Sequence, residues 1–262
     1  AETVMMLSDQ KCLVTGASSG IGKATCQILT KYGAAVVGTG RNESALSELK
    51  DKGFIADFVA ADLTAENKCE EVVKESVRLL GGKLTCLVNC AGILKGGAMG
   101  DVDLSNYRMN MTINTQVPFE MMTHAIPFLK ESSSSSIVNI SSVNGKQAFM
   151  GCVSYCMSKA AVDQLTRCAS VELAQYGIRV NAINPGVVET NLQKSGGLSE
   201  EQYDLFLKRS KEYSHPLAKS LGRVGQSEEI GELVAFLVSD KAKFMTGECI
   251  AVDGGRQNLG AR

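Results

Sequence analysis

The chain has 262 residues, of which 44% are hydrophobic and 21% charged, as expected for a folded protein with a sizeable core. Its 27 basic and 28 acidic residues leave a net charge of −1, which argues against nucleic acid or a membrane as a partner. Glycine is abundant (26) and proline rare (4), a combination that suits tight strand-to-helix turns and excludes an array of Pro-rich linkers.

Short apolar runs alternate with longer segments of helical periodicity along the whole sequence. Alternation of this kind is typical of βαβ units, in which helices cover both faces of a parallel sheet. No linker or change in composition divides the chain, so we expect one doubly wound, Rossmann-type α/β domain over residues 1–262. The predicted strands are 12–15, 35–39, 58–61, 84–88, 136–140, 178–183 and 249–252.

The segments between these strands place apolar residues at helical spacing. The first has Ile21, Ala24, Ile28 and Leu29 on one face. The predicted helices are 21–32, a segment around 45–49, 66–80, 106–129 and 154–176.

The nine cysteines are scattered without CxxC spacing, and an odd, scattered set argues against a disulfide framework. We therefore expect reduced thiols and a cytoplasmic protein. His124 and His215 are the only histidines, and neither has a second ligand at zinc-finger spacing, so no metal site is expected. Residues 1–7 form no signal peptide, and the apolar run 233–238 is far shorter than the ~18 residues that span a bilayer.

The first predicted strand leads into a glycine-rich turn, G-x-x-x-G-x-G, at residues 16–22. Glycines in such a turn allow backbone N–H groups to approach a pyrophosphate at the positive end of the following helix. A lone turn of this type also fits an ordinary strand-to-helix connection, but its position after the first strand of a βαβ series favours cofactor binding. The expected phosphate-site residues are Gly16, Ser18, Ser19, Gly20, Ile21 and Gly22.

The second predicted strand ends at Thr39-Gly40-Arg41 and has no acidic residue there. An acid at this point would bind a ribose 2′-hydroxyl and repel a 2′-phosphate. Arg41 offers a planar, permanently charged group suited to a phosphate, although a solvated surface arginine is the alternative. The sequence therefore favours NADP(H) over NAD(H).

Ser142, Tyr155 and Lys159 form the third motif. Tyr155 and Lys159 are four residues apart on the predicted helix 154–176 and share one face. An ammonium group near a phenol favours its ionised form, so the pair would yield an acid/base active near neutral pH. The Tyr-x-x-x-Lys pattern alone is commonplace and is usually a surface pair.

In combination, these motifs resemble the short-chain dehydrogenase/reductase family from about Leu7 to Asp253-Gly254-Gly255. The resemblance implies that Asn114, Ser142, Tyr155 and Lys159 are catalytic. It also implies further cofactor contacts, in which Tyr155 and Lys159 take part. These are Asp62, Leu63, Asn89, Ala91, Gly92, Pro185, Gly186, Val188 and Thr190.

Two departures from the family pattern matter. Cys90 replaces the second Asn of the N-N-A-G element, which places a thiol beside the cofactor. Ser141 and Ser142 form a doublet, and spacing alone selects Ser142. Cys152 and Cys156 flank Tyr155 and are interpreted as small packing residues rather than reactive thiols.

The resemblance implies an oxidoreductase that interconverts a carbonyl and a secondary alcohol, with Tyr155 as general acid/base, Ser142 stabilising the substrate oxygen and Lys159 binding the cofactor ribose. Asn114 would hold a water that connects Lys159 to solvent. A non-catalytic NADP(H) sensor or scaffold of the same fold is the alternative. A nucleotide-binding methyltransferase has no role for the Tyr155–Lys159 pair.

The substrate is a small carbonyl or alcohol whose identity the sequence leaves open. A reductase of acyl-carrier-bound ketones also resembles this chain, but it would need arginines at the pocket mouth, where the chain has Tyr176 and Lys130-Glu131. Residues 191–222 are interpreted as a mobile lid with a helix from Ser199, and a permanently packed helix is the alternative. The resemblance implies a homotetramer built on the helices 106–129 and 154–176 and on the segment 252–262.

Overall fold

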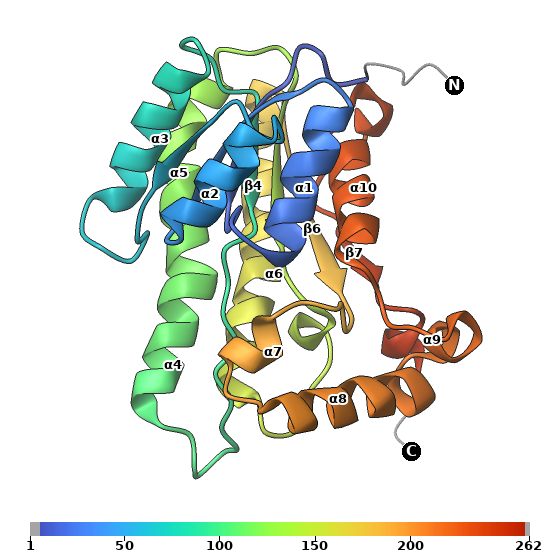
Figure 1. Cartoon of the computed structure of the whole chain (residues 1–262). Coiled ribbons are helices and arrows are strands. Elements are labelled where there is room, and N and C mark those ends of the chain that lie inside the picture. The colour runs from blue at the N-terminus through green and yellow to red at the C-terminus, as the bar shows by residue number, and fades with distance from the viewer. Residues whose placement is uncertain (1–5, 260–262) are drawn as a thin grey trace.

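The computed structural model describes residues 6–259 and contains a seven-stranded, fully parallel sheet in the order β3-β2-β1-β4-β5-β6-β7 (Figure 1). The doubly wound α/β fold expected from the sequence is confirmed. The strands are β1 (Lys11–Thr15), β2 (Ala35–Gly40), β3 (Asp57–Ala60), β4 (Cys86–Asn89), β5 (Ser135–Ile140), β6 (Ile178–Pro185) and β7 (Cys249–Val252).

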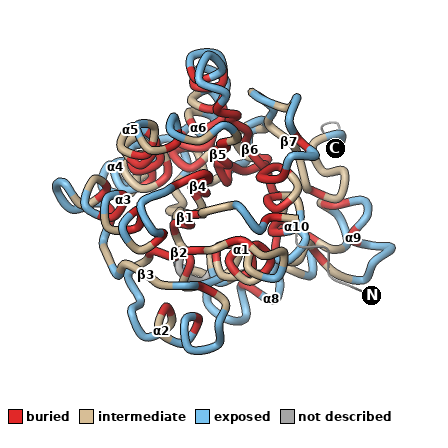
Figure 2. Tube along the Cα trace, turned by 90° about the horizontal axis from the view of Figure 1, so that it is seen from above, coloured by how far each residue is buried: buried red, intermediate tan, exposed pale blue. Residues whose placement is uncertain are grey.

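Helices cover both faces of the sheet, as the alternating pattern requires. Seen along the sheet, α1, α2 and α10 lie on one side, and α3, α4, α5 and α6 on the other (Figure 2). The helices are α1 (Gly20–Lys31), α2 (Glu43–Asp51), α3 (Lys68–Leu79), α4 (Leu104–Met111), α5 (Val117–Leu129), α6 (Val153–Leu173), α7 (Leu192–Ser195), α8 (Glu200–Arg209), α9 (Pro216–Leu221) and α10 (Ser227–Val238).

Two hydrophobic clusters flank the sheet and hold these layers together. The first joins α1, α2 and α10 to one face through residues such as Leu29, Leu46 and Val234. The second joins α3, α5 and α6 to the other face through residues such as Val73 and Met121. The central strands β1, β2, β4, β5 and β6 are almost wholly buried, whereas the edge strands β3 and β7 are partly exposed (Figure 2). Apolar residues identify the buried strands in the sequence.

The predicted element boundaries differ from the observed ones where local backbone geometry decides. The third helix starts at Lys68 because Asn67 adopts a left-handed conformation (φ 59°), which a helix cannot include. The predicted helix 154–176 ends as an α-helix at Leu173, and its last turn, Ala174–Tyr176, is 3₁₀. Between α4 and α5, the turn Thr112–Gln116 is a π-helix. Such π-turns are rare and are frequently found at functional sites.

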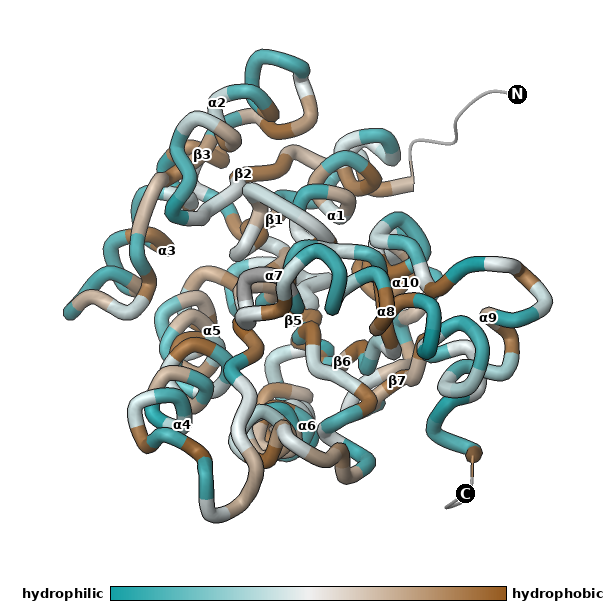
Figure 3. The backbone as a smooth tube through the Cα atoms, turned by 60° about the horizontal axis from the view of Figure 1, so that its bottom comes forward, coloured by the Kyte–Doolittle hydropathy of each residue, from teal (hydrophilic) through white to brown (hydrophobic). Residues whose placement is uncertain are grey.

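The carboxyl ends of all strands meet at one edge of the sheet, at the bottom of Figure 1. The chain order reverses between β1 and β4, which are neighbours in the sheet. In doubly wound folds this reversal opens a crevice for ligands. The segment that carries α7 and α8 passes in front of this edge, as Figure 3 shows with the bottom of the molecule turned forward.

The expected lid segment contains two short helices beside α8. Ser199 caps α8 through its hydroxyl, which accepts a hydrogen bond from the Gln202 N–H, and the Gln202 Oε1 in turn accepts one from the Ser199 N–H. This capping box explains why the helix starts where the sequence places it. The structure does not describe residues 1–5 or 260–262. The last of these belong to the C-terminal segment 252–262, which we expected to help assemble the subunits.

Candidate active site

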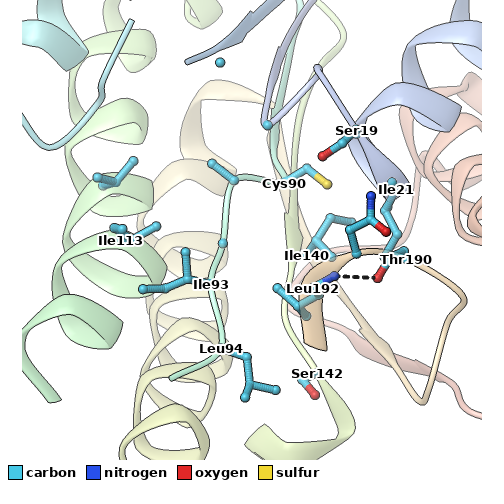
Figure 4. Close-up of a pocket in the computed structure, with 18 of the residues that line it drawn as sticks. Ser19, Ile21, Cys90, Ile93, Leu94, Ile113, Ile140, Ser142, Thr190 and Leu192 are labelled. Atoms are coloured by element: carbon cyan, nitrogen blue, oxygen red, sulfur yellow. Dashed lines mark hydrogen bonds between the residues drawn. The ribbon is translucent and has the colours of Figure 1, made fainter. Parts of the chain in front are cut away.

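A cleft of about 310 Å³ opens at the carboxyl edge of the sheet, at the reversal between β1 and β4. Figure 4 shows Ser19 and Cys90 at one end of it and Leu94 and Ser142 at the other, with Ile93 and Leu192 between them. Of the predicted site residues, those that line it are Gly16, Ser18, Ser19, Gly20, Ile21, Gly22, Arg41, Asp62, Leu63, Ala91, Gly92, Ser142, Tyr155, Lys159, Pro185, Gly186, Val188 and Thr190.

The glycine-rich turn between β1 and α1 is too tight for side chains at two of its positions. A Cβ on Gly22 would lie 2.2 Å from the Gly16 carbonyl oxygen, and Gly16 itself has φ +67° and packs against the backbone of Ala91. The turn therefore presents backbone at the start of α1, where the helix dipole is positive. This is a cradle of the kind that holds a pyrophosphate.

Arg41 and Asp62 lie in the cleft wall at the ends of β2 and β3. Asp62 Oδ1 accepts hydrogen bonds from the Thr64 backbone N–H (3.0 Å) and the Thr64 hydroxyl (2.8 Å). These bonds, helped by the charge of Arg41, lower the pKa of Asp62. Arg41 is exposed, so its guanidinium faces solvent at the mouth of the cleft. The two residues supply a cation and an anion at the end of the cleft distant from Tyr155.

Helix α6 brings Tyr155 and Lys159 into the cleft, and both are buried. The Lys159 Nζ donates a hydrogen bond to the Ile140 carbonyl (2.8 Å) and lies 5.8 Å from the centre of the Tyr155 ring. Burial lowers the pKa of Lys159 to about 8. Burial also raises the pKa of Tyr155 to about 12, and a hydrogen bond with Ser142 opposes that rise. We expected the ammonium to lower the pKa of Tyr155, but burial has the larger effect in this structure.

The two serines of the doublet at the end of β5 have different partners. The Ser141 hydroxyl donates to the Lys159 backbone carbonyl (3.1 Å) and thereby anchors α6 to the sheet. The Ser142 hydroxyl accepts a hydrogen bond from the Asn144 N–H (3.1 Å) and also bonds Tyr155. Of the two hydroxyls, therefore, it is that of Ser142 that shares a site with Tyr155.

Asn114 does not line the cleft. It lies in the π-turn, and its amide holds both the N–H and the C=O of Ile93 (2.8 and 2.9 Å) and the Ser158 hydroxyl (3.0 Å). Its side chain is thus committed to the loop after β4 and to α6. Its Oδ1 accepts one hydrogen bond, from the Ile93 N–H, and therefore keeps a second acceptor position. The water expected between Lys159 and solvent stays a prediction.

Asn110 repeats this arrangement one turn earlier, which the sequence motifs did not indicate. Its amide holds the N–H and the C=O of Lys95 (3.1 and 2.9 Å) and the Ser154 hydroxyl (2.8 Å). Because Ser154 precedes Tyr155, the pair Asn110 and Asn114 fixes the cleft-lining loop 93–95 to the same helix that carries the reactive groups. The only sequence signal for this arrangement is a matching spacing: Asn110 and Asn114 are four residues apart, and so are their partners Ser154 and Ser158.

Two residues of the N-C-A-G element face different surroundings. Asn89 lies outside the cleft, buried in the sheet, where its amide donates to Asn139 Oδ1 (2.9 Å). Cys90 lines the cleft (Figure 4), and burial raises its pKa to about 12. A thiol with so high a pKa carries almost no thiolate at neutral pH, so its reactivity is low.

The chain from Pro185 to Gly196 forms the wall opposite the glycine-rich turn. The Leu192 N–H bonds the Thr190 hydroxyl (3.4 Å, Figure 4), and the Tyr203 hydroxyl of α8 donates to the Thr190 carbonyl (2.9 Å). Gly196 packs so closely on Leu94 that a Cβ there would lie 2.6 Å from the Leu94 carbonyl oxygen. The segment therefore crosses the cleft and contacts its far side.

Among residues 6–259, no group of three His, Cys, Asp or Glu side chains lies close enough to hold a metal ion. Within the same residues, every helix is too short or too polar to cross a membrane.

Comparison with known proteins identifies relatives over nearly the whole chain. Residues 16–257 match the family model described as enoyl-(acyl carrier protein) reductase. A 3-oxoacyl-[acyl-carrier-protein] reductase of Thermotoga maritima is 32% identical over 256 residues, covering 96% of this chain and 99% of the relative. A cis-4-hydroxycyclohexanecarboxylate dehydrogenase of Sinomonas cyclohexanicum is 35% identical, covering 95% and 96%.

The solved structures agree with these relatives. A short-chain dehydrogenase/reductase of unknown function from Caenorhabditis elegans, determined with cofactor, superposes with a TM-score of 0.88 at 31% identity, covering 98% of each chain. A putative short-chain alcohol dehydrogenase of Sinorhizobium meliloti superposes with a TM-score of 0.87 at 30% identity, covering 98% of this chain and all of the other.

The hydrogen bonds of Asn110 with Lys95 and Ser154, which we call the Asn110 clamp, can be tested by their contribution to stability. Asn110→Ala leaves the buried Ser154 hydroxyl and the half-buried backbone groups of Lys95 without this partner, which should cost about 1–3 kcal/mol of unfolding free energy in total. Urea denaturation measures this loss. Asn106→Ala, one turn earlier on α4, is the matched control and should change stability by less than about 0.5 kcal/mol. Equal effects of the two substitutions would contradict the clamp.

Proposed function

Because the chain belongs to the short-chain dehydrogenase/reductase family, we propose that it is an NADP(H)-dependent reductase of a small ketone or aldehyde, working reversibly on the corresponding alcohol. One observation carries this proposal. Ser142, Tyr155 and Lys159 line the same cleft as the glycine-rich turn. An oxidoreductase site of this type needs a cofactor cradle and a proton donor in one cavity.

The cleft fits a nicotinamide dinucleotide by its chemistry. The turn that Gly16 and Gly22 keep free of side chains would hold the pyrophosphate, Asp62 the adenine end, and Arg41 a 2′-phosphate. Lys159 and Tyr155 would hold the ribose next to the reacting centre. When bound, the cofactor supplies or accepts the hydride.

Tyr155 acts as the general acid in the proposed reduction. Its high pKa keeps the proton on the phenol at neutral pH, where it is ready to be transferred to the substrate oxygen. The Ser142 hydroxyl, hydrogen-bonded to Tyr155, stabilises the charge that develops on that oxygen. The Lys159 ammonium then stabilises the tyrosinate that remains, in a site where burial strengthens their attraction. In the reverse direction the same groups accept the proton from the alcohol.

The walls beside Tyr155 support an apolar carbonyl substrate. Ile93, Leu94, Ile113 and Leu192 line this part of the cleft. The acyl-carrier-bound ketone stays an alternative, since one relative carries that activity in its name. The residues expected at the pocket mouth are not there: Lys130 stacks on Tyr176 (3.6 Å to the ring centre) just before the starts of β5 and β6, at the edge of the sheet opposite the cleft. A ketone panel that includes an acyl-carrier thioester distinguishes the two substrate classes.

We also propose a cytoplasmic homotetramer, for which light scattering is the test. The nine cysteines, all of them unpaired, support a reducing compartment. Large apolar side chains are exposed on the helices expected at the interface, and they support assembly because a subunit interface would remove them from water. They are Met109, Phe119, Met157 and Val171.

The acid/base role predicts the effect of Tyr155→Phe. The substitution removes only the transferable proton and keeps the ring, so kcat should fall more than a hundredfold while the Kd for NADPH stays within a few-fold. Steady-state kinetics and fluorescence titration measure the two. A variant that keeps more than about a tenth of kcat, about 1.4 kcal/mol of barrier, would show that the proton comes from elsewhere. A wild type that binds NADPH but turns over no ketone or alcohol of the panel would favour the non-catalytic sensor.

The shifted pKa values predict the pH dependence of reduction. Lys159 is charged below its pKa of about 8 and neutral above it, while Tyr155 stays protonated to about 12. We therefore expect kcat/KM for reduction to be level below pH 8 and to fall as the pH rises through about 8, because the cation that stabilises the tyrosinate is lost. A pH profile measures this. A profile that stays level well above pH 8, in protein that remains folded there, would exclude the role of Lys159.

Arg41 predicts the cofactor preference. The wild type should favour NADPH over NADH in kcat/KM, and Arg41→Asp should reverse the ratio by removing a charge-assisted contact and adding a like-charge repulsion. Lys23→Asp, an equal change of charge at the exposed surface of α1, is the control and should leave the ratio nearly unchanged. Equal use of both cofactors by the wild type would refute the preference.

We propose that residues 191–222 act as a lid over cofactor and substrate. The contacts of Tyr203 with Thr190 and of Gly196 with Leu94 cross the cleft and can break without disturbing the sheet. The far end of the segment is fixed at the buried His215, whose Nε2 accepts from the Val187 N–H (3.0 Å). Hydrogen exchange in this segment should be faster than in β4 and β5 and should slow when NADPH binds. Exchange as slow as in those strands without cofactor would instead indicate a permanently packed helix.

A further inference from the structure

Asp163 is a buried carboxylate for which the proposed mechanism has no use so far. It lies one turn after Lys159 on α6 and is only 2% exposed. Within residues 6–259 no lysine or arginine forms an ion pair with it. Its oxygens accept from the Asn184 amide of β6, at 3.0 Å to Oδ1 and 2.9 Å to Oδ2. A buried charge with only a neutral partner is costly, so its retention calls for a reason.

Asn184 links this carboxylate to the reactive serine. The same Asn184 Nδ2 donates to the Ser142 backbone carbonyl (2.8 Å). A carboxylate only accepts hydrogen bonds, so Asp163 fixes which end of the amide points towards Ser142. Asn184 itself is fully buried, and its Oδ1 has no partner within the described chain. The orientation of Asn184 is therefore set by its two acceptors, Asp163 and Ser142.

Lys159, one helical turn before Asp163 on α6, is a buried cation on the same face of the helix. It is 5% exposed, and its described partner is the uncharged Ile140 carbonyl. Gly145 packs against both residues, since a Cβ there would lie 2.7 Å from Asp163 Oδ2 and 2.9 Å from the backbone carbonyl oxygen of Lys159. In so enclosed a region the interaction between charges is weakly screened. Burial lowers the pKa of Lys159, and electrostatic interactions, first with Cys90 and then with Asp163, oppose that effect.

Two exposed cations lie on the Cys249 side of Asp163, where Lys146 donates to the Cys249 carbonyl and Arg167 to the Cys249 thiol (3.5 Å). The remaining titratable groups around the pair are a phenol and two thiols. Tyr155 precedes Lys159 on α6, and Cys90 faces it from the end of β4. Cys249 of β7 faces Asp163, and its thiol has a pKa raised by burial. At neutral pH these groups are uncharged, so Asp163 is the negative charge that Lys159 meets inside the protein.

We propose that Asp163 is a positioning residue of the active site with two effects. Its charge keeps Lys159 protonated, and its hydrogen bonds through Asn184 hold the Ser142 backbone in place. The inference rests on the proposed function for its kinetic consequences, but the charge effect on Lys159 can be measured without any substrate.

Two substitutions separate the two effects. Asp163→Asn removes the charge and keeps an acceptor for Asn184, so the fall of kcat/KM at alkaline pH should move to lower pH by about one unit. Asn184→Ala keeps the charge but releases Ser142, so kcat should fall about tenfold with the alkaline limb unmoved. Asp253→Asn removes another buried carboxylate, which accepts only backbone N–H bonds, and should leave the limb in place. The proposal is overturned if the alkaline fall of kcat/KM occurs at the same pH in Asp163→Asn as in the wild type, or if Asp253→Asn moves it equally.

A direct titration keeps the inference separate from the proposed reaction. In the full chain labelled with ¹³C-lysine, the Lys159 ε-carbon resonance, assigned by its loss in Lys159→Met, should titrate at lower pH in Asp163→Asn than in the wild type. Asp163→Glu, which restores the charge, should return it towards the wild-type value. An unchanged Lys159 titration refutes the charge effect even if no ketone is ever reduced. If Asp163→Asn does not fold, Asp163→Ser is titrated in the same way against the same outcomes.

Discussion

The constraint on which the site depends is the burial of an ammonium group. Lys159 lies inside the protein, where charge is unfavourable, and the surrounding structure is arranged to keep it there. The Ile140 carbonyl accepts from it, Asp163 contributes an opposite charge, and Gly92 has no side chain where a Cβ would lie 3.5 Å from the Nζ. The same burial raises the pKa of Tyr155, so one physical effect prepares both groups. In the proposed reduction, the phenol keeps its proton until a substrate oxygen takes it, and the ammonium stabilises the negative charge that then remains on the phenol.

Helix α6 acts as the rigid element to which each part of the site is attached. One face carries Tyr155, Lys159 and Asp163 in successive turns, and Ser154 and Ser158 bind Asn110 and Asn114 on a neighbouring face. Every long-range hydrogen bond to this helix reaches a segment that lines or supports the cleft. Catalytic groups gain most from fixed positions, because a misplacement of about 1 Å can cost a hundredfold in rate. The polar residues inside this layer are therefore better explained by positioning than by stability.

Much of the fold could be predicted because buried parallel strands are nearly continuous apolar runs. All seven strands lie where such runs occur, and the helix starts that were missed depend on local conformations such as that of Asn67. The cleft-lining residues were found through motifs with fixed spacing. Asn110, Asp163 and Asn184 belong to no such motif, because their partners are 15 to 44 residues distant and only the folded chain brings them together. Asn114 and Asn89 were assigned to the site, but their amides serve the framework behind it.

The contrast between the two walls of the cleft explains why chemistry can be inferred here more readily than substrate. The wall made by β4, β5 and α6 is fixed by buried hydrogen bonds and carries the groups to which we assign the proton transfer. On the opposite wall, residues 185–189 are fixed by backbone hydrogen bonds such as that of the Gly186 N–H with the Val252 carbonyl (2.9 Å). Residues 190–196, which follow, are held by contacts outside the sheet, such as that of Tyr203 with Thr190. Segments outside the sheet can vary in sequence without disturbing it. A fold of this kind can therefore keep one reaction while its substrate changes. The different names of two relatives, a 3-oxoacyl-[acyl-carrier-protein] reductase and a cis-4-hydroxycyclohexanecarboxylate dehydrogenase, fit that division.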